Sequence, residues 1–120
     1  MEDKVWLYDG EPEYVGINIA DATPEEGGYL VALELEDGTT RLVATRQPAK
    51  YIAGWKTNIR RFGAPEIIKV RAAGPFLQYE RIKRTMAGAL ASYLDESGAY
   101  RIDESTLDDA VSRVISALQS

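Results

Sequence analysis

The stretch YLVALELEDGTTRLVAT, residues 29–45, forms the centre of the predicted architecture. Its first half is mostly aliphatic with partial alternation, which is typical of a β-strand. Asp37-Gly38 supplies a hairpin turn, and Thr40 to Thr45 returns as the partner strand. The pattern therefore predicts an antiparallel hairpin, around which we expect an α+β fold.

A helix is predicted directly after this hairpin, over residues 48–62. Pro48 is tolerated in a first helical turn, and the apolar residues that follow fall within an arc of about 100°. These residues are Tyr51, Ile52, Trp55, Ile59 and Phe62. Gly63 and Pro65 are expected to end the helix. We expect Trp55 and Phe62 to pack in the core rather than to stack on bases.

The rest of the chain beyond this helix is predicted as strand, turn, helix and closing helix. Residues 66–71 are predicted as a strand, residues 72–75 as a turn, and residues 76–94 as an amphipathic helix. The last helix is expected to begin at a capping-box variant, Ser105 to Asp108. Its apolar positions are Leu107, Val111, Val114, Ile115 and Leu118.

The chain before the central hairpin is predicted as a second, shorter hairpin. Val5 to Tyr8 and Tyr14 to Ile19 are its expected strands, with turn residues between them. Residues 21–28 have neither a helical nor a strand period and are predicted as a loop. We expect a single domain over residues 1–120, in which an N-terminal hairpin and acidic loop (1–26) precede a core (27–95) and a C-terminal helix (96–120).

The amino-acid composition excludes several classes of function. The chain has 120 residues, and its 45% apolar content is sufficient for a folded core. Cysteine and histidine are absent, which excludes disulfide scaffolds, zinc sites with sulfur or nitrogen ligands, and triads built on histidine. No apolar run reaches the roughly 20 residues of a membrane span, and residues 1–4 lack the order of a signal peptide. We therefore expect a cytoplasmic protein with no membrane partner.

Charge is distributed very unevenly along the chain. Residues 41–84 contain eleven of the fourteen basic residues and only two acidic ones, which leaves this segment at about +9. Residues 1–40 carry about −10 and residues 85–120 about −4, so the whole chain has a net charge of −5. A basic segment of this kind favours a phosphate-binding surface. The opposite hypothesis is that its cations pair with the acidic flanks.

The predicted order from Gly27 onwards, strand, strand, helix, strand, helix and closing helix, resembles the GIY-YIG domain, in particular its phage-type members. Gly27-Gly28-Tyr29 stands where the first Gly-x-Tyr of the family opens strand one. Residues 41–45 stand where the second motif occupies strand two, and Pro48 then begins a helix. The resemblance implies a GIY-YIG-like core over residues 27–95.

The resemblance also implies candidate catalytic residues. In the family, tyrosines and an arginine activate water and hold the scissile phosphate, while a glutamate binds a divalent metal. These roles map onto Tyr29, Lys50 and Glu80, with Glu80 as the metal ligand for Mg²⁺. The alternatives are a half-buried strand tyrosine for Tyr29 and a surface ion pair with Arg84 for Glu80.

This chain departs from the second motif of the family. The motif's tyrosine is replaced by Arg41 or Leu42, depending on the register, and Lys50 stands where the helix arginine belongs. Lysine cannot reproduce the bidentate guanidinium clamp on a phosphate. We therefore expect a degenerate, non-catalytic member that needs no cofactor. Another register, with Tyr14-Val15-Gly16 as the motif, is followed by no arginine-bearing helix at the right place.

The expected function is binding of nucleic acid, with DNA as the expected partner, through a basic face. Its candidate residues are Arg41, Arg46, Lys50, Arg60, Arg61, Arg81 and Arg84. One alternative is a Mg²⁺-dependent endonuclease that uses Tyr29, Lys50 and Glu80. Another is a protein-interaction or inhibitor module that acts through the acidic N-terminal region. A further hypothesis is that residues 21–26, or the first hairpin, cover the basic face and compete with phosphate.

Overall fold

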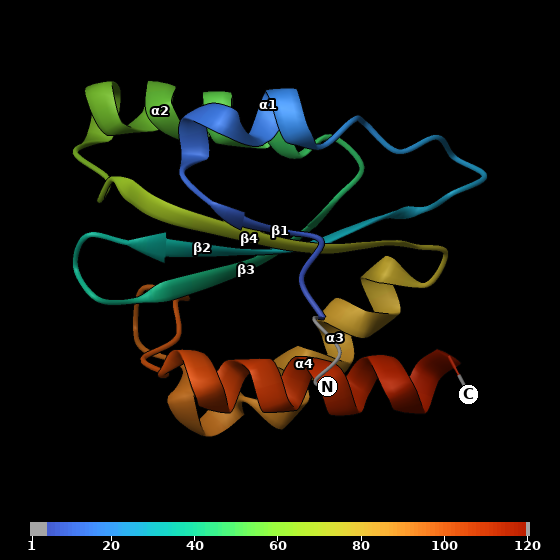
Figure 1. Ribbon diagram of the computed structural model, residues 1–120. Coiled ribbons are helices and arrows are strands. Elements are labelled where there is room, and N and C mark those ends of the chain that lie inside the picture. Colours follow the sequence, from blue (N-terminus) through green and yellow to red (C-terminus); the bar gives the residue numbers. More distant parts are fainter. Residues whose placement is uncertain (1–4, 120) are drawn as a thin grey trace.

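Two helical layers enclose a four-stranded antiparallel sheet in the computed structural model, which describes residues 5–119 (Figure 1). The strand order is β1-β4-β2-β3, with bounds Tyr8–Gly10, Ile67–Phe76, Gly28–Leu35 and Thr40–Thr45. Helices α1 and α2 cover one face, and α3 and α4 cover the other. Their bounds are Val15–Asn18, Pro48–Phe62, Tyr79–Ala89 and Glu104–Gln119. The protein is therefore of the mixed α+β class, as predicted.

The central hairpin β2–β3 is confirmed. Its pairs run in register from Tyr29 opposite Thr45 to Glu34 opposite Thr40. The turn is stabilised by Asp37, whose Oδ1 accepts the backbone N–H and the hydroxyl of Thr39 at 3.0 and 2.6 Å. Because these interactions are local, the turn is encoded by a few adjacent residues.

Helix α2 has the predicted bounds. It ends at Gly63, which adopts the left-handed conformation and donates its N–H to Ile59 O at 3.1 Å. Trp55 packs against the core as expected, but Phe62 is 77% exposed, so the prediction that Phe62 packs in the core is wrong. Rotation about the helix axis does not explain this exposure, because Tyr51 lies farther from the core-facing line through Ile52 and Ile59 and is only 38% exposed. Phe62 differs in being the last residue of the helix.

The predicted N-terminal hairpin is wrong. Tyr8–Gly10 forms β1, which pairs with residues 70–72 of β4 instead of with the segment that follows it in the chain. That segment forms the 3-10 turn η1 (Pro12–Tyr14) and the short helix α1. Val15 and Ile19, four residues apart, are both buried against the sheet. This spacing is helical, and it brings both side chains into one core cluster.

Strand β4 continues through the residues predicted as a turn, 72–75, and ends at Phe76. The reason is its long pairing with β2, which reaches Gly28 opposite Phe76. Gly27, at φ +96°, allows this close approach, since a Cβ there would lie 1.9 Å from Phe76 O. Helix α3 consequently begins only at Tyr79, and it ends at Ala89 before the 3-10 turn η2 (Ala91–Tyr93) instead of running to residue 94.

Helix α4 begins at Glu104, two residues earlier than a helix capped by Ser105 would begin. Asp103 Oδ1 accepts the N–H of Thr106 at 2.7 Å, so Asp103 provides the cap. Hydrogen bonds from Thr106 and Ser105 lower the pKa of the Asp103 carboxyl. Leu107, Val111 and Val114 are buried, as their spacing predicted.

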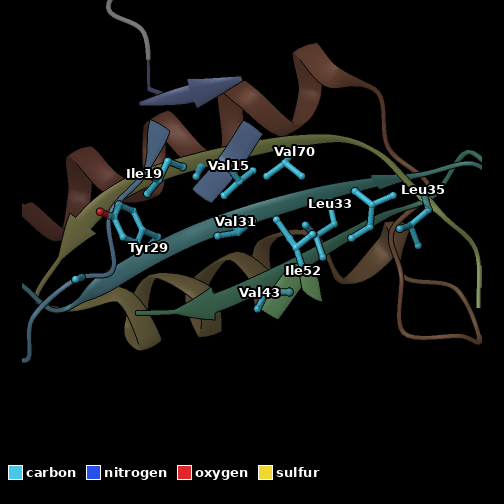
Figure 2. Close-up of a cluster of buried hydrophobic side chains, with 12 residues drawn as sticks. Val15, Ile19, Tyr29, Val31, Leu33, Leu35, Val43, Ile52 and Val70 are labelled. Carbon is cyan, nitrogen blue, oxygen red and sulfur yellow. The ribbon is translucent and has the colours of Figure 1, made fainter. Parts of the chain in front are cut away.

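Each face of the sheet has its own apolar cluster. Figure 2 shows the cluster beneath α1 and α2, in which Tyr29, Val31, Leu33 and Leu35 of β2 point to one side. The alternate residues of β2, Leu30 and Ala32, belong to the cluster beneath α3 and α4. The sheet therefore separates the surface of α2 from that of α3.

Candidate nucleic-acid interface

The outer surface of α2 carries positive charge with no acidic residue on the same helix. The helix contains Lys50, Lys56, Arg60 and Arg61. The side chain of Arg60 lies outside the described part of the structure, and the other three residues are exposed. Within residues 5–119, none of these three forms an ion pair. The outer face of α2 is therefore a cationic surface without ion pairs among the described side chains.

Lys50 and Arg61 lie on the side of α2 directly opposite its core-facing line. Lys56 lies nearer to the edge of this surface. Lys56 lines a depression of about 310 Å³ between α2, η1 and the start of β4. Two carboxylates, those of Glu13 and Glu66, line the same depression and offset its charge. Lys56 was not among the residues predicted to bind nucleic acid. Its position on a helix without acidic residues could have identified it as part of the cationic surface.

Arg41 and Arg46 lie on the same side of the sheet as α2 but are engaged with other groups. The Arg41 guanidinium lies 5.3 Å from the ring centroid of Trp55, and its Nη2 donates to Ser97 O at 2.8 Å. Arg46 Nε donates to Ala22 O at 3.4 Å. These contacts hold Arg41 against the protein, while Arg46 remains exposed and available at the start of α2.

The remaining predicted binding residues, Arg81 and Arg84, lie on α3. This helix packs on the opposite face of the sheet through the buried side chains of Ile82 and Met86. Arg81 and Arg84 are both exposed there, and Arg81 Nη1 donates to Gln78 Oε1 at 3.3 Å. The structure therefore places the predicted binding residues in two groups with the sheet between them, instead of on one continuous face.

Tyr29 is buried in the cluster of Figure 2. Its hydroxyl donates to Ala20 O at 2.8 Å. Burial raises the pKa of this hydroxyl, and the carboxylates of Glu26 and Asp21 raise it further. Loss of the Tyr29 proton is therefore disfavoured. The geometry matches the alternative of a strand tyrosine with a bonded hydroxyl, except that Tyr29 is buried instead of half-buried.

Lys50 and Glu80, the other two candidate catalytic residues, do not meet Tyr29. Lys50 is exposed on α2, and Glu80 is exposed in the first turn of α3, across the sheet. Glu80 forms no ion pair with Arg84 in the described structure, so that expectation is wrong. No group of three or more carboxylates suited to a metal ion occurs within residues 5–119.

Among the described side chains, the acidic flanks form ion pairs with two cations of the basic segment, Lys69 and Arg71. Arg71 is 2% exposed, and its Nη1 lies 2.6 Å from Asp108 Oδ1. Lys69 Nζ lies 2.6 Å from Glu104 Oε1. This hydrogen bond lowers the pKa of the Glu104 carboxyl and raises that of the Lys69 ammonium. Flank pairing therefore joins α4 to β4 and leaves the exposed cations of α2 free.

The acidic loop over residues 21–26 is held by hydrogen bonds that involve its backbone. Ala22 N–H donates to Arg46 O at 2.8 Å, and Glu26 Oε1 accepts the N–H of Thr23 at 2.9 Å. No ion pair joins a carboxylate of this loop to a basic residue in the described range. That arrangement gives no support to the idea that the loop neutralises the basic face.

Comparisons of the chain with protein-family models, with curated proteins and with solved structures found no match. The GIY-YIG resemblance therefore stays a prediction, which is based on the order of the elements more than on the motif residues. A membrane-spanning helix, one with sufficient length and apolar content, does not occur within residues 5–119.

Proposed function

We propose that this protein is a non-catalytic nucleic-acid-binding protein with a degenerate GIY-YIG-like core, and that it binds phosphates through the outer face of α2. The observation that carries the proposal is the cationic surface of Lys50 and Arg61 on a helix without acidic residues. Arg61 lies in the last turn of the helix, where the helix dipole favours a cation. Arg46, just before the helix, extends the surface toward the loop.

Electrostatic attraction to phosphates explains how a chain of net charge −5 could bind a polyanion. Affinity for nucleic acid depends on the local density of cations, since each contacted phosphate releases condensed counterions. In this fold, α4 places its carboxylates against Lys69 and Arg71, which are buried or half-buried. The acidic residues of the C-terminal helix are thus directed away from α2, which lies across the sheet (Figure 1).

A binding role is favoured over a catalytic one by the placement of the three candidate catalytic residues. Tyr29 keeps its proton in a hydrogen bond to a backbone carbonyl, and Glu80 lies on the far side of the sheet from Lys50. A nucleophilic or general-base step needs its groups within hydrogen-bonding reach of one reacting atom. These residues do not converge in that way.

The proposal is tested by charge reversal on α2 with a matched control on α3. Lys50→Glu/Arg61→Glu and Lys83→Glu/Arg84→Glu change the net charge equally, and all four side chains are exposed. Fluorescence anisotropy would measure binding of a labelled oligonucleotide, both single-stranded and as a duplex, at several salt concentrations. We expect the α2 variant to bind about tenfold or more weakly at low salt, and its salt dependence to decrease by about two units of slope.

Equal losses in the two variants would contradict a site on α2, because they would indicate a response to net charge alone. Wild-type binding by the α2 variant would refute the proposal. The same samples, incubated with Mg²⁺ and examined on a gel, test the endonuclease alternative. Cleavage that disappears in Glu80→Ala, with the fold intact by circular dichroism, would favour that alternative.

A further inference from the structure

Helix α2 carries two basic-aromatic pairs that repeat along one side. Lys50-Tyr51 lies in its first turn and Arg61-Phe62 in its last. The pairs are separated by eleven residues, which is about three turns of an α-helix and about 16 Å along its axis. The two aromatic rings therefore lie on one line of the helix surface, and the two cations lie on another line, about 100° away.

The core does not explain the position of these two rings. Phe62 is 77% exposed and Tyr51 is 38% exposed, whereas Ile52, on the core-facing side, is buried. Single exposed apolar side chains are ordinary on a protein surface, and these two rings differ in that each follows a cation on one helix.

Trp55, which is half-buried, lies nearly on the line of the helix between the two rings, and the exposed Asn58 lies beside it. Gly54, which is also exposed, lies between the line of the rings and the line of the cations. A Cβ added at Gly54 would meet no atom within 4 Å. The strip of α2 between the rings and the cations is therefore open at Gly54, with one cation beside each ring.

We infer that this strip of α2 binds single-stranded nucleic acid, with the rings of Tyr51 and Phe62 stacked on unpaired bases and with Lys50 and Arg61 on the phosphates. The inference rests on the proposed function and specifies its ligand. Sites for single strands combine a cationic path along the backbone with aromatic side chains that stack on bases. A duplex keeps its bases stacked on one another, so it offers phosphates to the cations but no free base face to the rings. The absence of acidic residues from α2 fits a polyanion.

The test uses three labelled probes of equal length: oligothymidylate, an abasic oligonucleotide with the same phosphates, and a duplex. The variant is Phe62→Ala, and the matched control is Ile17→Ala, which removes an 81% exposed apolar side chain from α1 in the same layer. We expect Phe62→Ala to bind oligothymidylate about tenfold more weakly. The salt dependence and the affinity for the abasic probe should stay unchanged. The control should bind all three probes as the wild type does.

The two proposals fail in different ways. If Phe62→Ala binds oligothymidylate as the wild type does, while Lys50→Glu/Arg61→Glu does not bind, phosphate binding stands and base stacking is refuted. Stronger binding of the duplex than of oligothymidylate would also refute the inference. If no probe binds at low salt, both proposals fail, and the exposed rings become the candidate contact for a protein partner. Circular dichroism of each variant confirms that the fold is retained.

Discussion

Removal of the Asp108 carboxylate tests the charge network that joins α4 to the sheet. Asp108 Oδ1 accepts hydrogen bonds from Arg71 Nη1 at 2.6 Å and from Trp6 Nε1 at 2.7 Å. The Trp6 ring also lies under the Arg71 guanidinium, at 5.1 Å from its centroid. Asp108→Ala would leave a buried guanidinium with Glu104, at 3.5 Å, as its remaining anionic partner in the described structure.

The size of the effect follows from burial. Removal of one partner of a fully buried ion pair costs about 3–5 kcal/mol of unfolding free energy. The Arg71 side chain is buried, but that of Asp108 is 43% exposed, so water can replace part of the lost interaction. We therefore expect Asp108→Ala to lower the free energy of unfolding by about 2–3 kcal/mol. For a domain of this length, that corresponds to a decrease in Tm of about 10 °C.

Urea denaturation followed by circular dichroism would measure this change. The matched control is Asp109→Ala, which alters the same charge on the adjacent, exposed residue of α4. The control should lose less than about 0.5 kcal/mol. Equal losses in the two variants, or a loss below about 0.5 kcal/mol in Asp108→Ala, would refute the reasoning. Replacement of Arg71 by Met in the Asp108→Ala background should restore part of the stability, because it removes the unpaired charge.

Two further predictions concern single residues. The hydrogen bond to Lys69 lowers the pKa of Glu104 in the folded state from its usual 4.5. The Glu104 carboxylate therefore stabilises the fold above pH 4.5, and this contribution is lost as the pH falls through the lower pKa of the folded state. The free energy of unfolding, measured as a function of pH, should differ less between the wild type and Glu104→Gln as the pH falls. A difference that stays constant with pH would contradict this role of Glu104. Tyr29→Phe should lower the free energy of unfolding by about 1 kcal/mol, because the hydrogen bond to Ala20 is lost. Oligonucleotide binding should stay unchanged. A loss of binding would instead indicate that Tyr29 takes part in the binding site.

Much of the local structure was predictable because the signals lie within a few residues of each other. The β2–β3 turn depends on Asp37 and Thr39, which are two positions apart. Helix α2 begins at Pro48 and ends before Gly63, which needs a left-handed backbone. Such signals act through backbone preference and adjacent hydrogen bonds, so they hold whatever the rest of the chain does.

The candidate site was predictable only in part. Acid-free α2, with Lys50 and Arg61, could be recognised from the order of the residues. The division of the predicted basic face by the sheet could not, since it depends on which face α3 covers. The exposure of Phe62 was also missed, because a helical projection does not show how far the core extends beneath the last turn of the helix.

The sequence alone was sufficient to predict the strands and the helix between residues 28 and 62, where strand, turn and helix signals agree locally. Long-range contacts were needed for the rest. Tyr8 joins the sheet opposite Ala72, β4 continues past its Gly74-Pro75 turn signal because β2 pairs with it, and Arg71 is neutralised by Asp108 of α4. In each case, partners far apart in the chain gain burial or hydrogen bonds that outweigh the local preference. A reading of adjacent residues cannot include that gain, because it exists only once the layers have packed.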